Sequence, residues 1–314
     1  MTTEIMNIRR TPTWSHVGKD VSQSKTMEQV LATSGLDYTV TKVPVFADIG
    51  AKDMELQPIE NRFATMRSSD GHLYDVVSDK FEIIQNKDAL SFVDYMGEGG
   101  LVFEKAGETA TGMVFVIGRL PEVSILGDTF TPHVIFRNGF SGKVKITAAI
   151  CPLRVVCQNQ FNFAFKNSSN TVTVRHVQNA ERKLEEAREV LKISANYMQE
   201  LSAMAETYAT KKLSSRALEW VLNAMFPMGN PDTLNGFAKK RLEIARAEFT
   251  AAYEADDNSN FRGTAWGMIN AYTDFLTHRE AMGNTDTKLE GKFTRVTFGK
   301  PMNDIIEIVD GIVA

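Results

Sequence analysis

The pattern of apolar and polar residues divides the chain near residue 175. Before this point, short runs of alternating apolar and polar residues end in glycine, asparagine or aspartate, as antiparallel strands and turns do. After it, apolar residues recur every three or four positions, which is typical of amphipathic helices. We therefore predict an α+β fold, with an antiparallel β-rich N-terminal half packed against a helical C-terminal half. Residues 1–36 would form an arm and a short helix, 37–176 a β-rich part with one helix, and 177–314 a helical part, together one compound domain.

The β-rich part is expected to begin with a strand-like run at Tyr38 and a loop over 48–59. Strands over 63–67 and 73–77 flank an Asp70-Gly71 turn and read as a hairpin. A helix is expected from Asn86 or Asp88 to Met96. Further strands are expected over 101–106, 113–119, 123–126, 131–137 and 143–149, with Asn-Gly and Ser-Gly turns before the last.

The helical part is expected to open with a long amphipathic helix whose apolar row runs from Leu184 to Tyr208. Helices over 214–225, 234–253 and 261–282 follow, and a mixed tail over 293–313 is expected to hold one strand and a short helix. The apolar row of the long helix is close to a heptad repeat, so this helix could pair with its copy in another subunit. Packing on the sheet of its own chain explains the same row, and we favour it.

Charge changes this picture because it is distributed unevenly. The net charge is −4 overall, yet residues 129–180 contain no aspartate or glutamate and six Lys or Arg, whereas 43–128 contain fifteen acids and seven bases. Phosphates attract cations, and unpaired bases stack on flat rings. The acid-free segment 129–180, which also contains six phenylalanines, therefore predicts a surface for single-stranded nucleic acid. Its cations are Arg137, Lys143, Lys145, Arg154, Lys166 and Arg175.

Two features of this segment have a second interpretation. If Lys143 and Lys145 lie on one strand, they share a face, with Arg137 across the turn; a solvated strand face can also carry lysines only to discourage edge pairing. Phe161, Phe163 and Phe165 alternate and would offer a stacking platform on a strand. Burial against the helical half is the alternative, and we favour it for the rings.

Metal and catalytic signatures are missing from the sequence. Cys151 and Cys157 are too far apart for a CxxC knuckle, and the five histidines show no HxxxH or HExxH spacing. No phosphate loop, dinucleotide fingerprint or nucleophile elbow occurs. A group of acids, Asp70, Asp75, Asp79 and Glu82, could hold a divalent cation, although solvated turns explain them better. We expect no enzyme, no metal and no cofactor.

Several short motifs occur together in an order that resembles one family. They are Trp-Ser-His-Val-Gly at 14–18, Val-Val-Ser-Asp at 76–79, Gln-Asn at 85–86, Gly-Glu-Gly-Gly at 97–100, Arg-Val-Val-Cys-Gln-Asn at 154–159, Arg-His at 175–176, Arg-Gly-Thr-Ala-Trp at 262–266 and Asn-Ala at 270–271. Over nearly its whole length the chain resembles the phage/plasmid-like protein family, a domain of unknown function carried by phages, plasmids and prophages. That family usually has Trp-His near its start, whereas Ser15 follows Trp14 here, so no role is carried onto His16.

The resemblance implies a setting on mobile-element DNA, often beside repair, recombination or antirestriction functions. Residues that the family repeats fall on Arg154, Gln158, Asn159, Arg175 and His176, all inside the acid-free segment. A β-rich half followed by a helical half is also similar to phage single-strand annealing proteins, which oligomerise and hold DNA in a basic groove.

We therefore expect a single-stranded DNA-binding or annealing protein of a phage or other mobile element. It would act as a homo-oligomer in the bacterial host cytoplasm, because no secretion signal or membrane-spanning run occurs in the sequence. The six cations, with Gln158, Asn159 and His176, would contact the nucleic acid. The alternative is a non-enzymatic module that binds a host protein and counters a defence or replication factor, through the acidic region 43–128 or the helical half.

Overall fold

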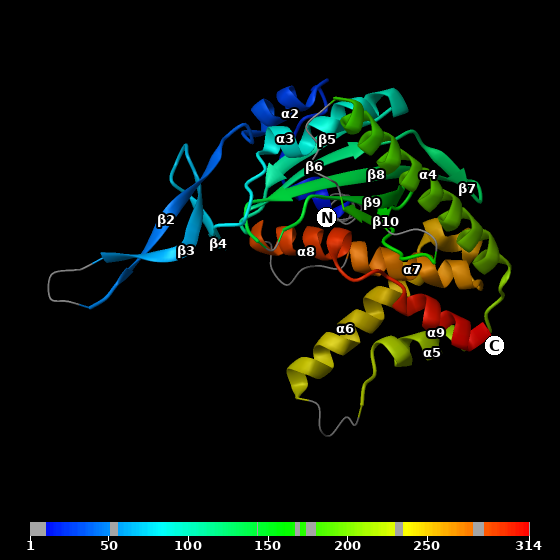
Figure 1. Ribbon diagram of the computed structural model, residues 1–314. Coiled ribbons are helices and arrows are strands. Elements are labelled where there is room, and N and C mark those ends of the chain that lie inside the picture. The colour runs from blue at the N-terminus through cyan, green and yellow to red at the C-terminus, as the bar shows by residue number, and fades with distance from the viewer. Residues whose placement is uncertain are drawn as a thin grey trace, which may run out of the picture.

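The fold is α+β, with antiparallel sheets in the N-terminal half and helices in the C-terminal half (Figure 1). The computed structural model describes residues 11–50, 56–142, 144–166, 170–173, 180–229, 235–278 and 286–313. Within these residues, the large sheet has the strand order β1-β5-β6-β8-β9-β10, with β7 beside β8 and β11 beside β9. Its strands are β1 (Lys19–Asp20), β5 (Val102–Glu108), β6 (Met113–Arg119), β7 (Val123–Ile125), β8 (Asp128–Gly139), β9 (Thr147–Arg154), β10 (Asn159–Gln160) and β11 (Thr171–Thr173).

Both faces of the large sheet are covered, which is why β6 and β9 read as nearly continuous apolar runs. One face of β6, with Val114 and Val116, packs against α2 (Met27–Ser34), α3 (Asn86–Leu90), the 3₁₀ helix η2 (Ser91–Gly99) and the start of α4 (Ala180–Thr210). The other face, with Phe115 and Ile117, packs against η1 (Thr13–His16) and Phe293 of α8 (Asp286–Phe298). Alternate side chains of one strand therefore enter two different cores.

Local signals set the ends of the first helix. Thr26 accepts a hydrogen bond from the Gln29 amide at the N-terminus of α2, and Gly35 ends the helix with a φ of 78°. The sequence offers Ser24 or Thr26 as the cap of a short helix and Gly35 as its stop; Thr26 is the cap, and the stop at Gly35 is confirmed. The predicted helix from Asn86 divides into α3 and η2, and the latter ends at Gly100 with a φ of 82°.

A second sheet forms an arm that projects from the body, at the left of Figure 1. It consists of β2 (Val40–Asp48), β3 (Leu56–Arg67) and β4 (Leu73–Ser78) in that order. The hairpin of β3 and β4 around Asp70-Gly71 was predicted and is confirmed. The loop predicted over 48–59 is wrong at Asp48 and over 56–59, because Asp48 pairs with Leu56 and both strands continue outward past the body. Residues 51–55 of that prediction lie outside the described residues.

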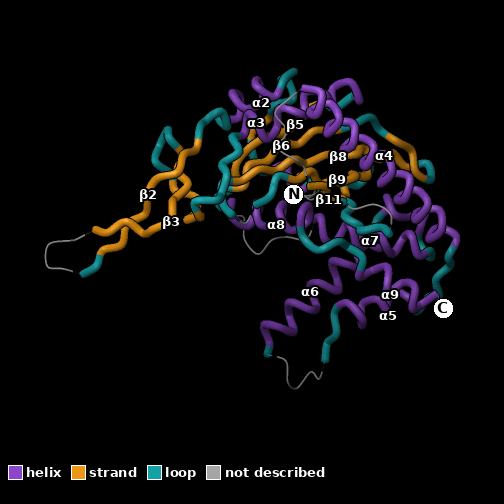
Figure 2. The backbone as a smooth tube through the Cα atoms, viewed as in Figure 1, coloured by secondary structure: helices purple, strands orange, loops and turns teal. Residues whose placement is uncertain are grey.

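The helical half packs below the large sheet and around α4, as the separate colours for helix and strand make clear in Figure 2. Its remaining elements are α5 (Ala217–Met225), α6 (Gly236–Tyr253), the 3₁₀ helix η3 (Asp256–Phe261), α7 (Ala265–His278) and α9 (Asp304–Val313). The long helix α4 confirms the predicted apolar row, whose Leu201 and Ala205 lie in the core of its own chain. The strand predicted in the tail is wrong, since α8 and α9 occupy its described part.

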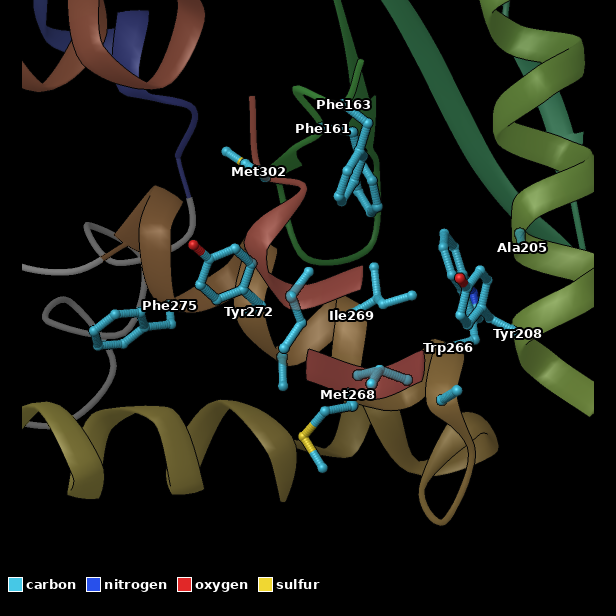
Figure 3. Packing of buried hydrophobic residues seen from close by; sticks show 14 of the residues in the cluster. Phe161, Phe163, Ala205, Tyr208, Trp266, Met268, Ile269, Tyr272, Phe275 and Met302 are labelled. Atoms are coloured by element: carbon cyan, nitrogen blue, oxygen red, sulfur yellow. The ribbon is translucent and has the colours of Figure 1, made fainter. Parts of the chain in front are cut away.

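The core between sheet and helices contains two of the three alternating rings. Phe161 and Phe163 are fully buried, and Figure 3 shows them pointing toward the helical half above Ile269. The ring of Phe161 stacks on Trp266 of α7 at 5.9 Å between centroids. The favoured interpretation of these rings as core is confirmed, so they offer no face to a base. The segment over 161–165 is extended without being a strand of the sheet.

Candidate nucleic-acid interface

The cationic surface predicted from the sequence is best developed where β9 begins. Arg137 lies opposite Thr147 in the β8–β9 register, and its Nε donates to Thr147 Oγ1 at 2.6 Å. The guanidinium lies 4.6 Å above the centroid of the Phe298 ring at the end of α8. Among the described residues, no carboxylate forms an ion pair with Arg137. A half-buried cation thus rests on an aromatic face with part of its charge still unpaired.

Burial lowers the pKa of Arg137 below its usual value, because desolvation penalises the charged form. Arginine still stays protonated at any physiological pH. The group that would complement the charge of this guanidinium is therefore an anion. A phosphate could take two parallel N–H bonds from this planar group, which a lysine cannot supply.

Two exposed cations lie on the segments that carry the two contact partners of Arg137, Thr147 and Phe298. Lys145 lies two residues before β9, beside Val144, which packs in the same small core as Phe298. Arg295 is exposed on α8 and precedes Phe298 by three residues, so both point to one side of the helix. Neither cation forms an ion pair within the described part of the chain. We call these three residues, Arg137, Lys145 and Arg295, the Arg137 surface.

Sequence reasoning placed Lys145 on a strand and missed Arg295. The strand predicted over 143–149 begins only at Thr147, so Lys145 precedes it. Arg295 was not predicted because its segment was expected to be mixed, and only a helix puts it on the same side as Phe298. The spacing of a cation three residues before an aromatic residue was the available signal.

Arg154 lies in the interior, not on this surface. Its side chain is 2% exposed, and its Nε and Nη2 contact Asp128 Oδ2 at 2.8 and 2.7 Å. Nη2 also donates to the backbone carbonyl of Asp257 at 2.8 Å. The guanidinium is therefore enclosed and paired, and its burial leaves no room for a phosphate.

The next motif residues fasten the sheet to α7. Gln158 has a positive φ of 58° in the β9–β10 turn, where its amide donates to Val155 O at 2.7 Å. Asn159 is 1% exposed. With its amide oriented so that the nitrogen faces α7, that nitrogen donates to Asp274 Oδ1 at 3.0 Å. Gln160 N then donates to Thr277 Oγ1 at 3.0 Å. These contacts explain the motif structurally, as a turn whose side chains dock α7.

The other predicted contacts lie apart from the Arg137 surface or outside the described residues. Lys166 is exposed and lines a cavity of ≈ 630 Å³ with Tyr208 of α4 and Ile306 of α9. Lys143, Arg175 and His176 fall outside the described residues. Of the nine predicted residues, Arg137 lies opposite the start of β9 and Lys145 two residues before it, whereas Arg154 and Asn159 are buried and Lys166 lines a separate cavity.

A comparison with known families places these motifs. A family model described as a domain of unknown function (DUF932) matches residues 73–296. The chain belongs to the DUF932 family. No curated protein and no solved structure matches it.

The DUF932 match covers the large sheet from β5 onward and the helices through most of α8. It therefore contains the Arg137 surface and the buried Arg154. Strands β2 and β3 of the arm precede the match, so the arm is carried mainly by sequence outside it.

The chemistry available elsewhere in the DUF932 protein is limited by burial. Burial raises the pKa of both Cys151 and Cys157 to about 12, which keeps the thiols protonated. No group of three or more His, Cys, Asp or Glu within the described residues could hold a metal ion. The acids that the sequence suggested for a divalent cation, Asp70, Asp75, Asp79 and Glu82, form no such group, and Asp70 pairs with Arg67 at 3.2 Å. None of the described helices is long and apolar enough to cross a membrane.

Proposed function

We propose that this protein binds single-stranded nucleic acid of a phage or other mobile element through the Arg137 surface, and that it works as a homo-oligomer. The observation that supports this most is Arg137 itself. Its guanidinium is half-buried on Phe298, and no carboxylate pairs with it in the described residues. A buried cation costs free energy unless an anion meets it, so the site favours an anionic ligand.

The positions of the three cations favour a flexible ligand. Lys145 is carried by a loop, Arg137 by a strand and Arg295 by a helix. A single strand can bend its phosphates onto such a set, whereas a duplex is stiff over this length. Arg137 would hold one phosphate bidentately, and Lys145 and Arg295 would neutralise its neighbours.

The burial of Arg154 changes the expected salt dependence. If only the three cations of the Arg137 surface meet phosphates, the slope of log K against log salt is about −2 for a single strand. A surface that used all six cations of the acid-free segment would give about −4. The slope therefore reports directly how much of the segment takes part.

Fluorescence anisotropy of a labelled single-stranded oligonucleotide across a salt series tests the proposal. Arg137→Gln and Lys145→Glu should each weaken binding and make the slope shallower by about 0.7 or more. Lys240→Glu on the exposed side of α6 is the matched control, since it makes the same charge change away from the Arg137 surface. A duplex of the same sequence distinguishes strand preference. No binding at low salt, or equal losses in the control, contradicts the proposal.

A second function has its own supporting observation. Trp220 on α5 and Phe237 on α6 are 54% and 64% exposed, unusually high for aromatic residues. Such rings can anchor a protein partner, as a module that counters a host factor would require. Stoichiometric capture of one host protein, surviving nuclease treatment and lost in Trp220→Ala, would favour this alternative.

A further inference from the structure

The arm has no cover of its own. β4 pairs with β3 only from Arg62 to Met66, so the outer part of the arm is a two-stranded ribbon with both faces open. Over 43–50 and 56–62, no residue is buried. An isolated two-stranded hairpin is marginally stable in water, so a ribbon of this kind gains from a partner.

The outer ribbon presents apolar side chains on one face. Phe46 lies opposite Pro58 and Asp48 opposite Leu56 in the register, so Phe46, Leu56 and Pro58 share a face. Phe46 and Leu56 are 51% and 55% exposed. Asp48 lies on the same face opposite Leu56, so the face combines three apolar side chains with one carboxylate.

The amount of open surface suits an interface. The fifteen residues over 43–50 and 56–62 are all accessible, and a standard interface uses about 20–30 residues on each side. Counting both of its faces, the arm would thus supply about half or more of one side. Pro44 and Pro58 lack an N–H and interrupt both edges of the ribbon, so contact through side chains is favoured over addition of a further strand.

A matching cavity lies on the same chain. It has a volume of ≈ 500 Å³ between α4 and β7 and is lined mainly by apolar groups such as Pro121, Ile125 and Met198. Ser194 also lines it, is 1% exposed, and has a hydroxyl without a hydrogen-bond partner among the described residues. Buried hydroxyls are usually paired, so this one points to an occupant that supplies an acceptor.

The arm and this cavity lie at opposite ends of the molecule, with β2 and β3 at the left and β7 with α4 at the right of Figure 1. An arm therefore cannot fill the cavity of its own chain in this arrangement, but a second copy can. We propose that the outer arm of one chain inserts its Phe46, Leu56 and Pro58 face into the α4–β7 cavity of a second copy.

This contact joins two different surfaces, so it is heterologous and continues from copy to copy into a ring or a filament. The inference names the interface of the homo-oligomer in the proposed function. It is measured without nucleic acid, so failure of either proposal can be told from failure of the other.

A complementation experiment tests the arm and the cavity separately. The arm variant is Phe46→Asp with Leu56→Asp, and the cavity variant is Ala195→Glu, which places a charge at the mouth of the cavity from an exposed position of α4. Ile244→Asp on α6 is the matched control, because Ile244 is 48% exposed and lies outside both surfaces. Light scattering after size exclusion gives the mass of each protein, and thermal melts confirm that each is folded.

Each variant should have the 35.0 kDa mass of one chain, while the wild type and the control should be larger. An equal mixture of the two variants should form a complex of two chains, because one variant keeps its cavity and the other keeps its arm. A monomeric wild type overturns the proposal. A cavity variant that remains oligomeric overturns it as well, since it indicates pairing of arm with arm.

Disulfide trapping gives a second readout that does not depend on disrupting the contact. Both native cysteines are buried, so introduced thiols dominate the reaction. Phe46→Cys mixed with Gln199→Cys should give a covalent dimer. Phe46→Cys mixed with Ile244→Cys should not. Equal trapping in both mixtures contradicts insertion into the cavity.

Discussion

Arg154 tests whether the strongest family motif serves the fold or the ligand. The change Arg154→Met keeps the unbranched stem and removes the guanidinium, leaving Asp128 and the carbonyl of Asp257 without their donor. Removing one partner of a buried pair costs about 3–5 kcal/mol. Asp128 is 20% exposed and keeps some hydration, so we expect the lower end of that range, about 3 kcal/mol.

Thermal melts and urea titrations measure this loss. At about 2 °C per kcal/mol for a chain of this length, Tm should fall by about 6 °C. Arg119→Met is the control, because Arg119 is 46% exposed and contacts Glu104 at 3.4 Å. An exposed pair of this kind contributes about 0–1 kcal/mol. The double variant Arg154→Met with Asp128→Asn should recover part of the loss, since no charge is then left unpaired.

One outcome would refute the structural role. If Arg154→Met melts like the wild type and instead loses oligonucleotide binding, Arg154 contacts the ligand and its buried pair must open. If stability falls while folded protein below its melting point still binds with an unchanged salt slope, the residue serves the fold.

Three further predictions follow from close contacts, thiols and a carboxylate. Gly267→Ala should lower the free energy of unfolding by about 1–3 kcal/mol, because a Cβ there would overlap the Phe261 carbonyl. In Gly291→Ala of α8 the new Cβ meets nothing within 4 Å, so this change should raise the free energy of unfolding by about 0.5–1 kcal/mol. Chemical denaturation measures both. Burial raises the pKa of Cys151 and Cys157 to about 12. Both thiols should therefore resist a thiol reagent near pH 8 in the native protein and react fully in denaturant. Rapid labelling of the native protein would contradict their burial. Burial acts to raise the pKa of Asp310, but hydrogen bonds from Lys211 and Tyr208 outweigh it and hold that pKa below 3.8. The hydrogen bonds to Asp310 therefore stabilise the fold at a pH above 3.8, and this stabilisation is lost as the pH falls below that value. Asp310→Asn should lower Tm at neutral pH and lower it less in acid. A difference in Tm that does not depend on pH would contradict this assignment.

Local signals carried most of the successful predictions. The cap at Thr26, the stop at Gly35 and the apolar row of α4 depend on residues a few positions apart, so the sequence alone contains them. The outer ribbon of the arm was missed for the opposite reason. A strand pattern is recognised by the core that one face enters, and the outer ribbon around Phe46 enters no core of its own chain.

The partner of Arg154 depends on a strand register that the sequence does not state. Phe130 lies opposite Arg154 in β8 and β9, which brings Asp128, two residues earlier, within reach of the guanidinium. The sequence shows Asp128 only as the last acid before the acid-free segment. Its pairing with a cation inside that segment could be inferred only once the two strands were aligned.

The same strands explain much of the missing acidity. Every residue of β9 is buried, and so is most of β8, because helices cover both faces of the sheet. An unpaired carboxylate in such a place would carry a desolvation cost of several kcal/mol, on the order of that for any buried ion, so the strands exclude acids whatever the ligand. The absence of aspartate and glutamate over 129–180 is therefore partly a property of the core.

Only those cations that are neither buried nor paired as part of the core therefore support binding to nucleic acid. Arg154 is buried but paired with Asp128, whereas Arg137 lies in the same sheet without a carboxylate partner among the described residues, and Lys145 is exposed two residues before β9. An unpaired guanidinium does not stabilise a core, since Met or Leu would pack on Phe298 without the cost of desolvating a charge. An anion from outside the chain would remove this cost, as the proposed function requires. The salt slope of Arg137→Gln is for this reason a sharper test than the charge of the whole segment.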